Sequence, residues 1–587
     1  MEQHQTSIYA GDIQQAGATA VGDNLQSSNP PTLPRPLPLN ILGRIFLYAL
    51  ATSSHKAKKD LINLCLVCKL WKDAAYRTQS LWNPIEINLW GRITPQLYDT
   101  AVSWLTRSAR ASRTLVVRTE YTRDDCPEPG HCALADPLLA KLLTVGPALD
   151  NLHIDSKCTQ CLGYLLDIMD SPGVRFTNLY GRPWDSLKSL GLTFRKIKVP
   201  FVPEPVPHKK RLRRSCKHSG DLFASRTRWD SDEDSEEMYE DHILCRLPKV
   251  ENFELHLPDD YETRMVDNIV IPDESEYFST VKNFTLKCEW RQYTVIALLQ
   301  ACYHVQVLTV DLMGKDTDTF VQMPDLAEPF SPPDLHTLRL RNIHPHNIGI
   351  VNSFDPYSLA ELDIAFSGPE EDEDCEKLVI PEVFYGYVKK LSESTEHGIK
   401  RLRIRSVYVS ESEDDWGPLF ELLQNLPELT HLTLDKMHIS ASVLKEIICS
   451  GKLTSLKRLE VLELRRIPAD LSLLALCAEI DSSRGDDGAA ANSLPPLPST
   501  LKKIIVSREV EDEDALCQEM EAVERSFKEL LNVEVVFVYE PREARQLHLN
   551  ASHTPTVSLH ENDTIEALSP AHLALLMSLS SAFRGLP

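Results

Sequence analysis

A short pattern of aliphatic residues returns along most of this 587-residue chain and constrains its fold more than any other feature. The pattern reads Leu-x-x-Leu-x-Leu, with Ile, Val or Phe as substitutes. In a strand, alternate side chains point to the same face, so the last two apolar residues of each copy predict one buried strand face. Twelve copies occur, at residues 149–154, 187–192, 250–255, 281–286, 305–310, 335–340, 359–364, 399–404, 429–434, 459–464, 501–506 and 533–538.

The spacing of these copies predicts how they assemble. Most neighbouring copies begin 24 to 32 residues apart, and the wider intervals measure 38 to 63 residues. Helical periodicity fills several intervals, as in residues 416–426 and 439–448. A unit of this size cannot bury its own apolar face. Stacked units would therefore share one elongated core behind a parallel sheet.

Pattern, spacing and helical intervals together resemble degenerate leucine-rich repeats, which run to about 20–29 residues and carry insertions in their loops. The resemblance implies an α/β fold, with an irregular leucine-rich-repeat solenoid and a parallel sheet over residues 86–540. The Asn that commonly follows the strand in this family has a candidate in Asn342. An ordinary α/β domain with leucine-rich strands is the alternative fold.

Residues 34–85 carry a second pattern, that of a small module of three helical elements. The first predicted helix begins near Pro38, a favourable first-turn residue. Its apolar face comprises Leu39, Leu42, Phe46 and Leu50. The second begins at Asp60, a suitable N-cap, and its apolar stripe comprises Leu61, Leu64, Cys68, Trp71 and Ala75. So small a module cannot hide every apolar side chain, so part of its surface is predicted to dock a partner.

Three runs in this module resemble the F-box family. They are Leu37–Phe46 (LPLNILGRIF), Leu64–Trp71 (LCLVCKLW) and the closing pair Leu81-Trp82. The resemblance implies an F-box protein that binds the Skp-type adaptor, and through it the cullin subunits, of a ubiquitin ligase. By the same resemblance, adaptor binding falls to Leu37, Pro38, Leu39, Ile41, Leu42, Ile45, Phe46, Val67, Cys68, Trp71, Leu81 and Trp82. Some of the later residues in this set would instead build the small core.

The same resemblance implies a function for the whole chain. It would be a substrate-recognition adaptor whose repeats capture a target protein, while catalysis lies in other subunits. A repeat scaffold that works outside any ligase is the alternative. Two departures favour that alternative: Asn40 stands where the family often has an acid, and the predicted connection between helices, 51–59, is long and basic. A helical cap on the repeat array is a further alternative for the module.

Composition narrows the classes of function. A net charge of −23 disfavours binding to nucleic acid or to anionic membranes. Residues 1–33 are polar, which predicts a disordered tail without a signal peptide. We expect no membrane span, and we expect the 14 cysteines to be reduced thiols. The expected location is therefore the cytoplasm, the nucleus or both, with proteins as partners.

Two further segments are predicted to interrupt or follow the repeats. Residues 203–245 would form a disordered charged insertion with an acidic tract at 230–237. Its basic cluster is a candidate nuclear-localisation signal, with a solvated, charge-balanced loop as the alternative. This cluster comprises Lys209, Lys210, Arg211, Arg213 and Arg214. Residues 541–587 would form a C-terminal tail with a capping helix.

The sequence predicts neither an enzyme nor a metal or cofactor site. Gly451-Lys452 lacks the leading glycine of a phosphate-binding loop, and His560-Glu561 lacks the second histidine of a zinc protease helix. Cys158-x-x-Cys161 suits half of a zinc site, but the upstream cysteines are too irregularly spaced to complete it. A hydrolytic or metal enzyme is the remaining alternative.

Overall fold

The computed structural model describes residues 37–51, 57–108, 111–119, 133–156, 159–171, 182–194, 243–257, 278–288, 290, 292–313, 329–367, 382–406, 419, 421–437, 456–466, 500–509, 534–540 and 557–559. The helical elements of the described residues, in chain order, are α1 (Leu39–Ala51), α2 (Ala57–Val67), α3 (Lys69–Arg77), the 3-10 helix η1 (Gln79–Trp82), α4 (Pro95–Arg107), α5 (Pro137–Val145), α6 (Thr159–Asp170), the 3-10 helices η2 (Pro183–Ser186), η3 (Ile243–Arg246) and η5 (Phe278–Thr280), α8 (Gln292–Leu299), the 3-10 helix η6 (Pro345–Ser353) and α9 (Glu382–Ser394).

The strands begin after η1. They are β1 (Ile85–Leu89), β2 (Thr114–Thr119), β3 (Asn151–Ser156), β4 (Ser189–Phe194), β5 (Asn252–His256), β6 (Asn283–Lys287), β7 (Val307–Asp311), β8 (Thr337–Ile343), β9 (Glu361–Phe366), β10 (Arg401–Arg405), β11 (His431–Asp435), β12 (Val461–Arg465), β13 (Lys503–Glu509), β14 (Glu534–Glu540) and β15 (Val557–Leu559).

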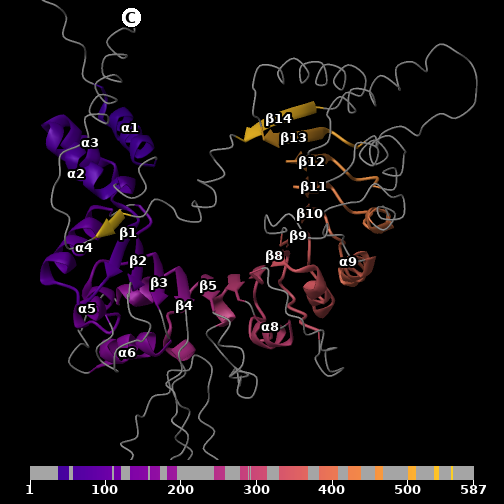
Figure 1. Cartoon of the computed structure of the whole chain (residues 1–587), viewed down its shortest axis with the longest axis horizontal. Helices are drawn as coiled ribbons and strands as arrows, with labels where there is room; N and C mark the ends of the chain where they lie inside the picture. Colours follow the sequence, from indigo (N-terminus) through magenta and orange to yellow (C-terminus); the bar gives the residue numbers. More distant parts are fainter. Residues whose placement is uncertain are drawn as a thin grey trace, which may run out of the picture.

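All these strands belong to one sheet, and β1 to β14 lie in it in chain order. Each neighbouring pair is parallel, and β15 pairs with β1 at the edge. Figure 1 shows the strands on the inner side of an open arc, with α5, α6, α8 and α9 on its outer side. The predicted α/β class with a parallel sheet and N-terminal helices is confirmed. Stacked repeats require this order, because each unit pairs with its neighbour in the chain.

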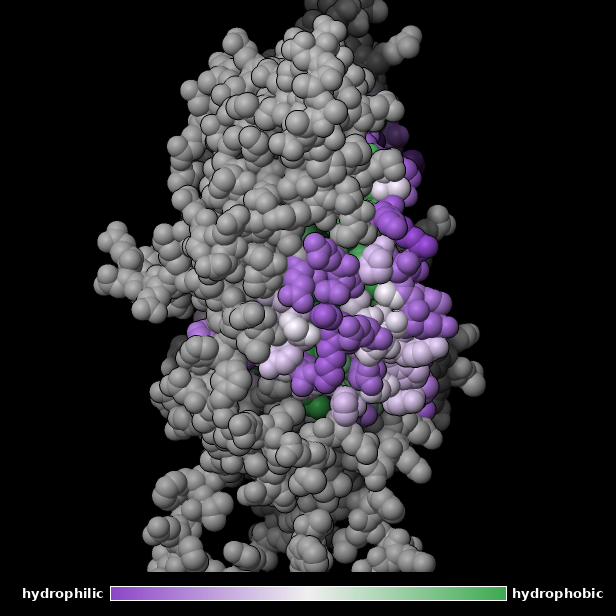
Figure 2. All heavy atoms as spheres, turned by 90° about the vertical axis from the view of Figure 1, so that its right-hand side faces the viewer, coloured by the Kyte–Doolittle hydropathy of each residue, from purple (hydrophilic) through white to green (hydrophobic). Residues whose placement is uncertain are grey.

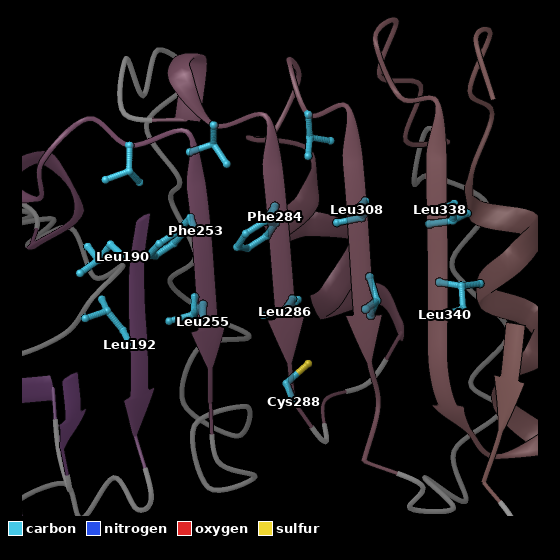
Figure 3. Packing of buried hydrophobic residues seen from close by; sticks show 14 of the residues in the cluster. Leu190, Leu192, Phe253, Leu255, Phe284, Leu286, Cys288, Leu308, Leu338 and Leu340 are labelled. Carbon is cyan, nitrogen blue, oxygen red and sulfur yellow. The ribbon is translucent and has the colours of Figure 1, made fainter. Parts of the chain in front are cut away.

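The core consists of rows of side chains that run across successive strands. In β10 and β11, Leu402 pairs with Leu432, and Ile404 with Leu434, and all four are buried. Figure 3 shows the same two rows crossing β4 to β8. The predicted copies from 149–154 to 501–506 are buried at all three apolar positions. Each strand therefore completes the core of the strands beside it.

A backbone ladder at the start of the strands repeats with the same regularity. The carbonyl of Lys400 accepts hydrogen bonds from the N–H groups of Thr430 and His431. Carbonyls one residue before the other strands accept two N–H groups in the same way, from Arg113 through to Glu460. Because these bonds join one strand start to the next, register is fixed whatever the length of the loop between them.

A positive-φ residue near the end of several strands repeats as well. Asn342, Ser406, Lys436 and Arg466 each follow the second inward strand residue by two positions and have a positive φ of 50 to 58°. Asn tolerates this left-handed backbone better than most residues. The Nδ2 group of Asn342 donates to Oδ1 of Asp311 at 2.8 Å. Asn342 therefore lies within β8, at a register shift between Leu340 and Ile343 rather than after the strand, and it bonds the side chain of the last residue of β7.

Two strands precede the first predicted copy. In β1 the three apolar positions are held by Trp82, Ile85 and Ile87, all buried. In β2 the inward residues are Leu115 and Val117, but the first position is Ser112. A search for aliphatic triplets misses both strands, because one triplet opens with an aromatic residue and the other with a polar one.

The register predicted for the last copy is wrong. The copy at 533–538 would turn Val536 and Val538 inward, but Ile504 pairs with Val535 and Val506 pairs with Phe537. Val535 is buried and Val538 is 42% exposed. Four consecutive apolar residues leave β14 without alternation, so its sequence alone does not choose a face. The pairing with β13 makes that choice.

Several predictions lie outside the described residues. They are the tail 1–33, the basic cluster 209–214, the cysteines at 126, 132 and 158, the C-terminal capping helix, and the insertion 203–245 up to its last three residues, which open η3. The predicted tail 541–587 contributes β15. No helix in the described part of the chain is long and apolar enough to cross a bilayer. The described ranges also hold no cluster of three metal-ligating side chains.

Asp435 at the end of β11 is a fully buried carboxylate that joins the ends of three neighbouring strands, β10, β11 and β12. Nη2 of Arg403 donates to its Oδ2 at 2.5 Å, and Nε of Arg466 donates to its Oδ1 at 2.9 Å. Burial by itself raises the pKa of the Asp435 carboxyl, but the hydrogen bonds from both arginines outweigh it and lower that pKa below the ordinary value. The ionised carboxylate therefore stabilises the fold.

We expect Asp435→Asn to lower the free energy of unfolding of this region by about 2 kcal/mol at pH 7, because two guanidinium groups lose their counter-charge. The contribution of this carboxylate is present above about pH 4 and is lost as pH falls through its lowered folded-state pKa. Urea denaturation at pH 7 and at acid pH measures both effects. Asp334→Asn, a change at an exposed carboxylate, is the control. Equal denaturation midpoints for the two variants would contradict the assignment.

Candidate docking site

Helix α1 carries two apolar stripes on different faces. The inward stripe, Leu42, Phe46 and Leu50, is buried in the core. The outward stripe has the spacing i, i+4, i+7 and comprises Ile41, Ile45 and Tyr48. Ile41 is 39% exposed and Tyr48 is 79% exposed. A helix with a second, exposed apolar stripe is suited to binding a partner.

The second predicted helix is divided in the structure. Helix α2 begins at Ala57, so Asp60 lies in its first turn rather than at its cap, and the connection from α1 is shorter than predicted. Cys68 has extended backbone, with φ −163° and ψ 169°, and α3 begins at Lys69. The prediction of one continuous helix is therefore wrong.

The break at Cys68 has a packing consequence. It lets the ring of Trp71 lie against that of Phe46, with centroids 5.1 Å apart, and it buries Ala74 and Ala75. On the other side of the break, Leu66, Val67 and Cys68 are exposed. The break therefore closes the small core and leaves an apolar corner on the surface.

Exposed apolar surface is concentrated in these three helices. Of twelve large hydrophobic side chains exposed among the described residues, seven lie in α1 to α3. They are Ile41, Leu47, Tyr48, Ile62, Leu66, Val67 and Tyr76. By contrast, the side of the molecule shown in Figure 2 presents mostly hydrophilic residues where the chain is described. Such a concentration marks a surface that contacts another protein.

The rim of this surface is basic although the chain is acidic. The described residues of 37–82 include six basic and two acidic side chains, 6 − 2 = +4, against −23 for the chain. An open depression of about 550 Å³ lies between the start of α1 and the end of α3. It is lined by Leu39, Asn40, Arg44, Arg77 and Thr78. The module therefore suits a partner whose surface is apolar with acidic groups around it.

Trp82 fixes the module to the sheet. Its ring meets Trp104 of α4 edge to face at 5.0 Å between centroids and lies 5.3 Å from that of Tyr76. The guanidinium of Arg107 lies over the Trp82 ring at 4.8 Å, and the indole N–H donates to the Ala75 carbonyl at 2.9 Å. We call Tyr76, Trp82, Trp104 and Arg107 the Trp82 joint. Rings packed on several sides restrict rotation of the helices against the first repeat.

The structure sorts the predicted adaptor-binding residues by exposure. Four are buried in the core: Leu42, Phe46, Leu81 and Trp82. Burial corrects the assignment of Leu42 and Phe46 as contacts, and it places Leu81 and Trp82 in the small core, which was the other possibility for them. Eight are exposed or half-buried, and their binding role stays a prediction: Leu37, Pro38, Leu39, Ile41, Ile45, Val67, Cys68 and Trp71. Sequence reasoning missed Tyr48, Ile62 and Leu66. Ile62 and Leu66 are four residues apart, off the core stripe, which is the signal that identifies them.

Gly43 of α1 lies against Thr78, the C-cap residue of α3. A Cβ atom there would lie 2.0 Å from Oγ1 and 3.1 Å from Cβ of Thr78. The Thr78 hydroxyl is held by donation to the Ala74 carbonyl at 2.9 Å. The contact therefore requires glycine in α1.

We expect Gly43→Ala to separate α1 from α3 and destabilise the module by about 1–3 kcal/mol, the usual range for overpacking. Amide hydrogen exchange of α1 measures the loss locally. Gly91→Ala is the matched control, because no atom lies within 4 Å of the added methyl group. Unchanged protection of α1 in Gly43→Ala would refute the steric argument.

Comparison with known proteins addresses this part of the chain directly. Residues 35–88 match the model of the F-box-like family. Comparison with curated proteins gives no match. Among solved structures, the crystal structure of a Bacteroides fragilis protein matches with 10% sequence identity. The match covers 48% of this chain and 74% of the Bacteroides fragilis chain. Its TM-score of 0.22 is too low to support a shared fold. The matched span coincides with α1 to η1 and the start of β1, so this region is an F-box-like domain and supports an F-box protein.

Proposed function

We propose that the chain is the substrate-recognition adaptor of a Skp–cullin–F-box ubiquitin ligase. In this proposal the F-box-like domain docks the Skp-type adaptor, which connects the chain to the cullin subunits. The supporting observation is a coincidence in position: the family match at 35–88 covers the same helices that hold seven of the twelve exposed large hydrophobic side chains. A docking domain needs this surface, whereas a helical cap needs only the face that covers the sheet.

We further infer that the sheet is a leucine-rich-repeat solenoid. Three repeating features support this: strands in chain order, core rows at matched register, and positive-φ residues at one repeat position. The outward face of the strands is free of the packing demands of the core. A target protein would bind there, as in other repeat arrays.

The proposed adaptor works by placement rather than by chemistry of its own. Holding a target lysine near the charged enzyme raises its effective concentration, and the transfer itself takes place in other subunits. A fixed distance helps, and the Trp82 joint restricts motion between the F-box-like domain and the first repeat. We therefore assign no catalytic residue to this chain.

A scaffold acting outside any ligase is the second candidate. Asn40, exposed at the start of α1, replaces an acid that is common in the family, and this observation favours the scaffold. The long connection that also favoured it is shorter than predicted, because α2 begins at Ala57. Purified chain that binds the Skp-type adaptor without recruiting cullin would support the scaffold.

Ile41→Asp tests the docking surface without touching the core. We expect it to weaken binding to the Skp-type adaptor about tenfold or more, because a charge would be buried in an apolar contact. Titration calorimetry with purified full-length chain measures the change. The matched control is Val538→Asp, since Val538 is exposed to the same degree at the far end of the sheet. Equal affinities for both variants would exclude α1 from the interface.

Salt should weaken the same complex. The basic rim of the F-box-like domain, +4 among its described residues, predicts attraction to acidic groups that ions screen. We expect the association rate to fall as NaCl rises from 50 to 500 mM. In Arg44→Gln/Arg77→Gln the salt dependence should be smaller. A rate that does not respond to salt would show that the rim makes no contribution.

A further inference from the structure

The outward face of β8 to β12 carries a cluster of arginines that neither the core nor the F-box-like domain uses. Leu402 and Ile404 of β10 point into the core, so Arg401, Arg403 and Arg405 point to the opposite face. The pairing registers place arginines of β8 and β12 on the same face. We call this set the arginine face: Arg339, Arg341, Arg401, Arg403, Arg405, Arg465 and Arg466.

The positive charge is local to these strands. Strands β8 to β12 contain six arginines and four acids, 6 − 4 = +2, and Arg466 directly after β12 adds one more. Strands β1 to β7 contain two basic and four acidic residues, 2 − 4 = −2, with histidine counted as neutral. The outward strand face is therefore bipolar, and its basic half lies far from the F-box-like domain.

Two of the four acids of the basic half, Asp363 and Asp435, lie beneath its arginines, and Glu361 and Glu463 stay partly exposed, at 33% and 18%. The side chains of Asp363 and Asp435 are 7% and 0% exposed, whereas those of Arg403 and Arg405 are 27% and 23% exposed. Arg341 and Arg401 are exposed as well. A partner approaching this half therefore meets more guanidinium groups than carboxylates.

The buried acids also hold the guanidinium groups in place. Arg405 donates from Nε to Oδ1 of Asp363 at 3.1 Å and from Nη2 to Oδ2 at 2.5 Å. These bonds use two of the five N–H donors of the guanidinium. Nε of Arg403 is buried without a hydrogen-bond partner among the described atoms. A row of arginines fixed in this way binds anionic oxygens at a reduced entropic cost.

We propose that the arginine face binds an acidic segment of the target protein, a short extended run of carboxylate or phosphate groups. The inference rests on the proposed function and deepens it by naming the class of target. Guanidinium forks match carboxylate and phosphate geometry. Five strands span about 19 Å, the length of about six extended residues. A long nucleic acid would extend onto the acidic half of the face and be repelled.

Fluorescence anisotropy of labelled peptides with the full-length chain tests the proposal. The probes are a hexaglutamate peptide, a peptide of the same length with three phosphoserines, a hexaglutamine peptide and a single-stranded hexanucleotide. We expect either or both acidic peptides to bind, the stronger one identifying the anionic group, and the hexaglutamine peptide not to bind. Arg341→Gln/Arg401→Gln should weaken the binding about tenfold. The matched control, Arg92→Gln/Lys188→Gln, removes the same charge at exposed positions away from this face.

Four results would overturn the proposal: no binding of either acidic peptide, binding of hexaglutamine with equal affinity, preference for the oligonucleotide, or equal effects of the two double variants. Tight peptide binding only after the acids of 230–237 are replaced by Ser would assign the face to the chain's own acidic tract, and this too would overturn it. Measuring binding of the Skp-type adaptor distinguishes failure of the arginine-face proposal from failure of the proposed docking function. Arg341→Gln/Arg401→Gln should leave adaptor binding intact, and Ile41→Asp should leave peptide binding intact.

Discussion

The structure depends on one constraint: a single strand with its connecting segment has too little surface to shield the aliphatic side chains that the strand turns inward. Leu432 has Leu402 and Leu462 in register on either side of it, and all three are buried. The carbonyl ladder holds that register at the strand starts. The core lies on one side of the sheet and the carbonyl ladder lies at the strand starts. The outward strand face can therefore vary in charge, and the loops can vary in length.

The same constraint explains which parts of the fold could be predicted from sequence. Aliphatic triplets that alternate with polar residues predict inward and outward faces, and eleven of the twelve copies are buried as expected. A search for such triplets fails where a position holds a residue that is not aliphatic, or where apolar and polar residues do not alternate. The triplets of β2 and β1 are not recognised, because their first positions are held by the polar Ser112 and the aromatic Trp82. The apolar run in β14 does not define a register, which is set by the pairing with β13.

The docking site was harder to predict, because a pattern of apolar residues does not say which of two stripes is buried. Ile41 and Phe46 both look like core or contact in the sequence, and only the position of α3 separates them. The arginine face could not be predicted from the sequence for a different reason. Arg405 and Asp363 are 42 residues apart, so their pairing requires the register of two strands. Local patterns contain no information on such a pair.

The bipolar strand face also bears on how a bound target would be oriented. The F-box-like domain is joined to β1, and the arginine face begins at β8, about 34 Å away at ordinary strand spacing. An acidic segment held on β8 to β12 would leave β1 to β7, whose strands contain more acids than bases, open to another part of the same protein. That half favours basic surface, and lysines are the residues that ubiquitin transfer modifies. In the proposed adaptor, charge on the two halves of one sheet would therefore direct target lysines toward the F-box-like domain.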